Sequence, residues 1–170
     1  DLVLANQLKL DLYPSDKDKI LDKTKYLKYQ SLKSNTINMI DENQHIFIVG
    51  MPRSGSTLLE SILSMKSNVS ALGETNLLEE VYSEWKTKIN QTSHVSLSNI
   101  YSSKISVSNA KLITTNKQLF NYQYTGIILN QFPNAQIINC FRNPLDNLLS
   151  IYRANFVNGN YYSSSLTDSA

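Results

Sequence analysis

One segment, the eight residues from Gly50 to Thr57, limits what this chain can fold into more than any other. It follows residues 45–50, an apolar and β-branched run typical of a strand that is buried on both faces of a sheet. It precedes residues 57–65, whose apolar side chains recur at helical spacing. The segment itself reads G-x-x-x-x-G and leads into a helix start, where successive backbone N–H groups can hold an anion. We therefore predict a strand, an anion-binding loop and a helix. The alternative is a tight turn that merely exposes its arginine.

The rest of the chain continues this alternation of strand and helix. Short apolar runs predict strands at 69–72, 111–115 and 135–141, and helical spacing predicts helices from Thr75, at 119–131 and from Pro144, the last capped by Asn143. Residues 90–110 are rich in Ser and Asn and carry little signal. The alternation predicts an α/β fold, a P-loop-like three-layer α/β/α arrangement with a parallel sheet. In such sheets ligands bind beyond the carboxyl ends of the strands.

A polar, helical segment precedes this α/β part. A break at Tyr13-Pro14-Ser15-Asp16 separates a first predicted helix from a second, which runs to about Lys33 and for which Ser15 is the expected cap. Residues 1–42 are therefore interpreted as a helical lead-in or as the end of an upstream helical module. Residues 43–170 are expected to form the second unit.

Composition excludes several classes of protein. The 16 Lys and Arg against 14 Asp and Glu leave a formal charge of +2, too balanced for a generic nucleic-acid binder. A single cysteine, Cys140, excludes a disulfide framework and a cysteine-rich zinc site, and no constellation of metal ligands is present. No apolar run approaches the roughly 20 residues of a membrane span, and no signal peptide opens the sequence. We therefore expect a cytoplasmic protein with no transmembrane segment, no metal and no nucleic-acid partner.

The arginines carry more information than the charge totals. Only three of the 16 cations are arginines, and two of them, Arg53 and Arg142, directly follow predicted buried strands. Ser56 stands where a nucleotide triphosphatase has its phosphate-binding lysine, so Arg53 is the cation available inside the loop. Ser150 lies two turns into the helix after Arg142, on a polar stripe with Arg153 that could also be a plain solvated face. Two arginines at two strand ends indicate a ligand with two separate phosphates.

These residues resemble a known family. The segments F-I-V-G-M-P-R-S-G-S-T and C-F-R-N-P-L-D-N-L-L-S-I-Y are similar to the 5′-phosphosulfate loop and the 3′-phosphate motif of sulfotransferases that use 3′-phosphoadenosine-5′-phosphosulfate (PAPS). The likeness is greatest to the bacterial branch often fused to tetratricopeptide repeats, which is related to protein-tyrosine sulfotransferases, and it covers about residues 44–165. The resemblance implies that Arg142 and Ser150 hold the 3′-phosphate. It implies that the 5′-phosphate and the sulfonate are held by Arg53 and the amides of Ser54, Gly55, Ser56 and Thr57.

The same resemblance extends to two catalytic positions. Glu74, in Gly73-Glu74, resembles the catalytic base of the family, and Lys117 resembles the lysine that stabilises the transferring sulfonate and the leaving oxygen, with Arg53 adding charge. Transfer to a hydroxyl needs a base at the nucleophile and fixed positive charge at the developing negative charge, and it needs no metal if these cations supply that charge. Thr75 follows Glu74 where tyrosyl sulfotransferases carry a further acid, which departs from the tyrosine-specific pattern.

The function implied is transfer of sulfonate from PAPS to a hydroxyl acceptor: a sugar, a lipid, a small phenol or a peptidyl tyrosine. The alternatives are a nucleotide-binding module without turnover and a P-loop phosphotransferase. The chain looks like the amino-terminal half to two-thirds of a sulfotransferase domain that is truncated at its carboxyl end. We expect Arg53, Glu74, Lys117, Arg142 and Ser150 to converge on one open crevice, and apolar surface to be exposed near residue 170.

Overall fold

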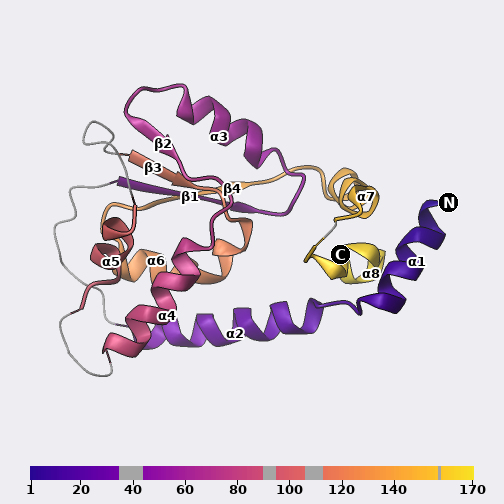
Figure 1. Cartoon of the computed structure of the whole chain (residues 1–170), viewed down its shortest axis with the longest axis horizontal. Helices are drawn as coiled ribbons and strands as arrows, with labels where there is room; N and C mark the ends of the chain where they lie inside the picture. Colours follow the sequence, from indigo (N-terminus) through magenta and orange to yellow (C-terminus); the bar gives the residue numbers. More distant parts are fainter. Residues whose placement is uncertain (35–43, 90–94, 106–112, 157) are drawn as a thin grey trace.

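A parallel sheet organises the computed structural model, which describes residues 1–34, 44–89, 95–105, 113–156 and 158–170 (Figure 1). Its four strands have the order β2-β3-β1-β4, and every neighbouring pair is parallel. Their bounds are β1 (Gln44–Gly50), β2 (Val69–Ala71), β3 (Ile113–Asn116) and β4 (Gln136–Cys140). With helices on both of its faces, the sheet forms a three-layer α/β/α fold, and the predicted fold class is confirmed.

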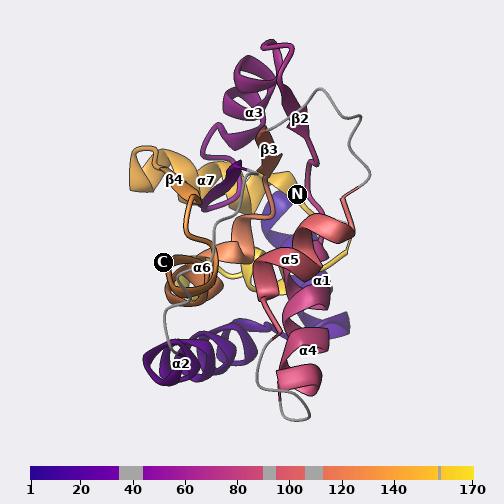
Figure 2. The same cartoon turned by 90° about the vertical axis from the view of Figure 1, so that its left-hand side faces the viewer.

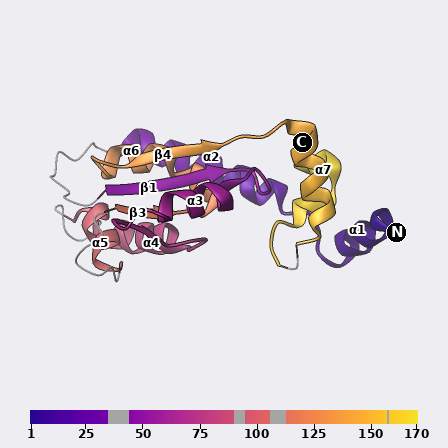
Figure 3. The same cartoon turned by 90° about the horizontal axis from the view of Figure 1, so that it is seen from above.

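The helices form the outer layers and one end of the molecule. Figures 1 and 2 show α3 on one face of the sheet and α2, α4, α5 and α6 on the other. Figure 3 shows α1, α7 and α8 beyond the carboxyl ends of the strands. The bounds are α1 (Leu2–Leu12), α2 (Lys17–Lys33), α3 (Ser56–Ser64), α4 (Leu77–Ile89), α5 (Leu97–Ser103), α6 (Thr125–Gln131), α7 (Pro144–Ala154) and α8 (Leu166–Ser169), with short 3₁₀ helices η1 (Leu119–Tyr124) and η2 (Tyr161–Ser164).

The hydrophobic core lies between the sheet and the layer formed by α2, α4, α5 and α6. Phe47 of β1 is fully buried there, and its ring lies 5.7 Å from that of Tyr101 and 5.4 Å from that of Phe132. The rings of Tyr101 and Phe132 are 5.4 Å apart at an angle of 87°, an edge-to-face arrangement. This aromatic centre fixes the orientation of β1, the strand that leads into the Gly50 loop.

The second helix of the lead-in is packed onto the α/β part. Leu27 of α2 is 2% exposed and belongs to the hydrophobic core. Gln123 donates a hydrogen bond of 3.0 Å to the carbonyl of Ile20, and Asn130 donates one of 2.9 Å to the carbonyl of Ser31. The helix therefore contributes to the core of the sheet domain.

The strand register brings the predicted loops to one edge of the sheet. Gly50 is paired with Cys140, Phe47 with Asn116 and Ala71 with Thr115. Because all four strands are parallel, the segments that follow them emerge on the same side. The edge thus receives the segments after β1, β2, β3 and β4, which carry the candidate residues.

Several elements differ from the sequence-based expectation. Residues 97–103 form α5, because Ser96 caps the helix by accepting a hydrogen bond from the Asn99 N–H and Tyr101 anchors it in the core. The helix expected at 119–131 is divided into η1 and α6, and part of the strand expected at 111–115 lies outside the described residues. Helix α2 begins after Asp16, whose side chain makes no capping hydrogen bond, while the Ser15 hydroxyl accepts a hydrogen bond of 3.4 Å from the Lys17 N–H.

The apolar residues of α7 do not face the core as an amphipathic stripe would. Leu145 and Leu149 are exposed, whereas Asn147 and Ile151 are buried. Phe141, just after β4, is 79% exposed, and Leu166 in α8 is 50% exposed. The expected apolar surface near the carboxyl end is therefore present.

Across the described ranges, none of the helices combines the length and the apolar character that a bilayer span requires.

Candidate functional site

The loop between β1 and α3 has the backbone shape of an anion-binding turn. Arg53 (φ 67°) and Gly55 (φ 97°) both adopt the left-handed conformation, and Gly55 is the N-cap of α3. Left-handed residues in such turns direct neighbouring N–H groups inward, and the unpaired N–H groups of the first helical turn add to them. The conformation costs a non-glycine residue about 1–3 kcal/mol, so its surroundings hold Arg53 there. The Ser54 hydroxyl is buried without a hydrogen-bond partner in the described part of the chain, so it can serve a ligand.

Helix α7 contacts this loop through Asn147 and Ser150, and Arg142, which lies between β4 and α7, contacts it as well. Arg53 Nε lies 3.3 Å from Ser150 Oγ, to which it donates, and Arg142 Nη1 lies 3.5 Å from the carbonyl oxygen of Arg53. Asn147 is buried and donates a hydrogen bond of 2.7 Å to the carbonyl of Pro52. The structure therefore brings Arg53, Arg142 and Ser150 together from the ends of β1 and β4.

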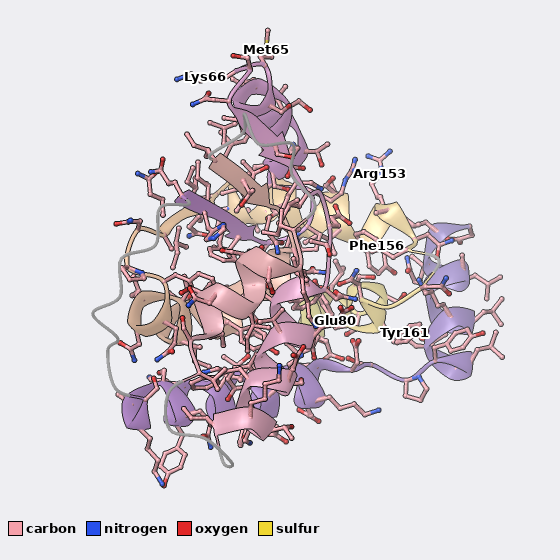
Figure 4. All side chains as sticks on the ribbon, turned by 60° about the vertical axis from the view of Figure 1, so that its left-hand side comes forward. Met65, Lys66, Glu80, Arg153, Phe156 and Tyr161 are labelled. Atoms are coloured by element: carbon pink, nitrogen blue, oxygen red, sulfur yellow. The ribbon has the colours of Figure 1, made fainter. Side chains whose placement is uncertain are left out.

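The local sequence explains the course of α7. Asn143 accepts hydrogen bonds from the N–H groups of Leu145 and Asp146, and Pro144 occupies the first turn, as predicted. This cap makes the chain turn directly after Arg142, so that the helix crosses the sheet edge. Arg153, the remaining arginine of the sequence, is exposed and extends outward from α7 (Figure 4).

Glu74 and Lys117 form an ion pair at the same edge. Glu74 follows β2 and Lys117 follows β3, and the backbone N–H of Lys117 donates to the carbonyl of Gly73 at 2.9 Å. Lys117 Nζ lies 2.5 Å from Glu74 Oε1. The side chain of Lys117 is only 7% exposed, whereas that of Glu74 is 64% exposed. The base and the cation of the expected pair are therefore adjacent, with the carboxylate on the open side.

Two cavities border the loop, not the single crevice that the sequence predicts. A cavity of about 540 Å³ is lined by Arg53, Gly55, Ser56, Thr57 and Glu74, together with Phe120 and Phe156. Arg142 instead lines a neighbouring cavity of about 640 Å³, with Gly50, Met51 and Cys140. The first residues of the loop thus line the 640 Å³ cavity, and its last residues line the 540 Å³ cavity. Contacts between Arg142, Arg53 and Ser150 connect the two cavities.

The remaining titratable groups of the edge are few. Burial raises the pKa of the Cys140 thiol, which disfavours the nucleophilic thiolate form. The His, Cys, Asp and Glu side chains of the described ranges form no group of three that could hold a metal ion. Positive charge at the edge comes from Arg53, Lys117 and Arg142.

Two residues at this edge were not singled out by the sequence. Asn147 was missed, although it follows the cap Asn143 by one turn and lies beside Leu148 in the sequence. Glu60 of α3 was also missed; it is buried and accepts a hydrogen bond from the N–H of Gly73, the residue before Glu74. A polar residue at helical spacing from a motif is the signal that could have found both.

Comparison with known proteins agrees with these features. Residues 45–170 match the sequence profile of the sulfotransferase family. An uncharacterized protein of Aquifex aeolicus (strain VF5) is 32% identical over 133 residues. That alignment covers 65% of this chain but 17% of the Aquifex protein, so the aligned part spans less than a fifth of that relative's length. The family profile covers the sheet from His45 onward and every candidate residue from Arg53 to Ser150, and on this basis the chain belongs to the sulfotransferase family.

Proposed function

We propose that this chain binds PAPS and transfers its sulfonate to a hydroxyl acceptor. The observation that carries the proposal is the contact of Arg53 with both Arg142 and Ser150, which unites two arginines from two strand ends at one edge. Arginine presents a fork of donors that fits phosphate and sulfonate oxygens. A donor with separate 5′-phosphosulfate and 3′-phosphate groups matches two such arginines better than a nucleotide with one phosphate chain.

The nucleotide would lie across the loop. Arg53 and the N–H groups of residues 54–57 would hold the 5′-phosphosulfate, and the buried Ser54 hydroxyl would gain a partner. Arg142 and Ser150 would hold the 3′-phosphate from the other side of the loop. Arg53 Nε and Arg142 Nη1 now donate to neutral protein oxygens, and charge-assisted bonds to phosphate oxygens are about twice as strong.

Sulfonyl transfer would then use the Glu74–Lys117 pair. Glu74 takes the proton from the acceptor hydroxyl, whose oxygen forms a bond to sulfur while the bond from sulfur to the phosphate oxygen breaks. Lys117 donates to that leaving oxygen, where negative charge develops. During the reaction Lys117 must therefore weaken its contact with Glu74 in order to donate a hydrogen bond to the leaving oxygen of the donor. The acceptor would approach through the 540 Å³ cavity, which Glu74 and Phe120 both line.

Nucleotide binding tests the proposal directly. We expect 3′-phosphoadenosine 5′-phosphate, the desulfonated product, to bind more tightly than ADP in calorimetry. Arg142→Ala should weaken its binding about 10- to 100-fold, since a hydrogen bond to a charged group is worth about 1.5–3 kcal/mol. Arg153→Ala is the matched control, because this arginine lies on α7 but is exposed and extends away from the loop, and it should leave binding unchanged. Equal affinity for the two nucleotides, or a magnesium-dependent preference for ATP, would overturn the proposal.

A further inference from the structure

Helix α3 has an inverted pattern of burial. Its buried residues are Ser56 and Glu60, one turn apart, while Leu58 and Ile62 are 68% and 54% exposed. Burying a carboxylate is costly unless it is hydrogen-bonded. Apolar packing alone therefore does not explain why Glu60 is buried while Leu58 is exposed. Glu60, which is 7% exposed, must be held by specific contacts.

Those contacts connect three elements through one oxygen atom. Glu60 Oε1 accepts a hydrogen bond of 3.2 Å from the N–H of Gly73 and one of 2.8 Å from the hydroxyl of Thr115. Gly73 directly precedes Glu74, and Thr115 lies on β3 two residues before Lys117. The carboxylate therefore ties the helix that begins in the anion-binding loop to both segments that carry the ion pair.

Backbone hydrogen bonds connect the Gly73 segment to β3 and to Lys117 of the ion pair. The carbonyl of Gly73 accepts from the Lys117 N–H at 2.9 Å, and the N–H of Leu72 donates to the carbonyl of Thr115 at 2.8 Å. Gly73 thus has its N–H bound to Glu60 and its carbonyl bound to the backbone of Lys117. Without Glu60, Gly73 would keep its hydrogen bond to the backbone of Lys117 and lose its hydrogen bond to α3.

We propose that Glu60 is a positioning residue, which sets the place of Glu74 and Lys117 relative to the anion-binding loop. This inference rests on the proposed sulfonyl transfer. The base must reach the acceptor hydroxyl while the donor sulfur is held at the loop, and a misplacement of about 1 Å can cost about 100-fold in rate. Glu60 touches neither donor nor acceptor in this arrangement; it fixes the distance between the groups that do.

The test compares three variants of the full-length protein. Glu60→Ala removes the acceptor for both donors, so kcat should fall about 10- to 100-fold while the dissociation constant for 3′-phosphoadenosine 5′-phosphate changes less than about threefold. Glu60→Gln keeps an amide oxygen with two lone pairs and should restore kcat to within a few-fold of the original. Leu59→Ala is the control, because it truncates the neighbouring, half-buried side chain of the same helix and leaves the Glu60 carboxylate in place, and it should not lower kcat selectively.

Hydrogen exchange separates the inference from the proposed function. Amide exchange over residues 72–74 should become faster in Glu60→Ala and stay slow in Glu60→Gln, whether or not the protein transfers sulfonate. If the unmodified protein is inactive with PAPS and every acceptor, the proposed function fails. The hydrogen-exchange result then tests by itself whether Glu60 positions residues 72–74. Unchanged exchange in Glu60→Ala overturns the positioning role. So does an unchanged kcat in an active protein, or a fall in kcat no larger than that of Leu59→Ala.

Discussion

Replacing Gly50 with alanine should destabilise the fold at the point where β1 enters the loop. Gly50 has a φ of 139°, a conformation that side chains rarely adopt, and it is paired with Cys140 across β1 and β4. A Cβ atom there would lie 2.4 Å from the backbone oxygen of Cys140 and 3.3 Å from its carbonyl carbon and its nitrogen. The neighbour is backbone, so it cannot rotate away, and the strands must separate locally.

The size of the effect follows from two contributions. The disfavoured backbone conformation costs about 1–3 kcal/mol. Separating the strands weakens the last hydrogen bond of their ladder, which costs about 1 kcal/mol more. A total of about 2–4 kcal/mol corresponds to a fall in Tm of about 4–16 °C for a chain of this size. Denaturant unfolding followed by the fluorescence of Trp85, the single tryptophan, would measure the loss.

Gly159→Ala is the matched control for this prediction. Gly159 also has a positive φ, 67°, but a Cβ there would meet no atom within 4 Å. That variant should lose only the conformational contribution, about 1 kcal/mol. Equal losses of stability in Gly50→Ala and Gly159→Ala would refute the reasoning, because the contact with Cys140 would then contribute nothing.

The remaining predictions concern Glu74, the proposed base, and Glu84, a surface carboxylate. Glu74→Gln should leave nucleotide binding nearly intact and lower kcat by about 100-fold or more, whereas Glu80→Gln on an exposed part of α4 should do neither; full activity of Glu74→Gln at neutral pH would exclude Glu74 as the base. Hydrogen bonds from Lys104 and Lys88 lower the pKa of Glu84 to about 2 from its ordinary value of 4.5. The folded-state pKa is depressed, so these contacts stabilise the fold above pH 4.5 and this stabilisation is lost as the pH falls toward 2. The stability difference between the original protein and Glu84→Gln should shrink over that range, and a constant difference in pH-dependent unfolding would contradict it.

The strands and the loop could be predicted because their causes are local. A strand of a parallel sheet is covered on both faces, so residues 46–49 form an unbroken apolar run that stands out in the sequence. The loop is marked by Gly50 and Gly55, and the start of α7 by Asn143 before Pro144. Once the strands are parallel, the order of segments along the chain places their following residues at one edge. The position of Arg53 and Arg142 at the same edge could therefore be predicted.

The burial of individual side chains could not be predicted in the same way. Leu145 and Leu149 form an apolar stripe by sequence, yet both are exposed, and Asn147 is buried instead. The amide is buried because it donates to the carbonyl of Pro52, which lies 95 residues away in the sequence. Helix α5 was missed for a related reason, since its apolar residues span less than two turns within a Ser- and Asn-rich stretch and its anchor Tyr101 packs on distant Phe47. Contacts between segments so far apart leave no periodic signal.

The two helices beside the loop hold it by the same physical means. Helix α3 buries Glu60 against the N–H of Gly73, and α7 buries Asn147 against the carbonyl of Pro52. Each helix thus contacts the sheet edge through a side chain that hydrogen-bonds to backbone, while two of its large apolar residues are exposed: Leu58 and Ile62 in α3, and Leu145 and Leu149 in α7. Apolar packing tolerates small shifts, whereas a buried hydrogen bond weakens steeply with distance and angle. An edge fixed in this way can keep Arg53 in a left-handed conformation, and it can keep Glu74 and Lys117 at a set distance from the loop.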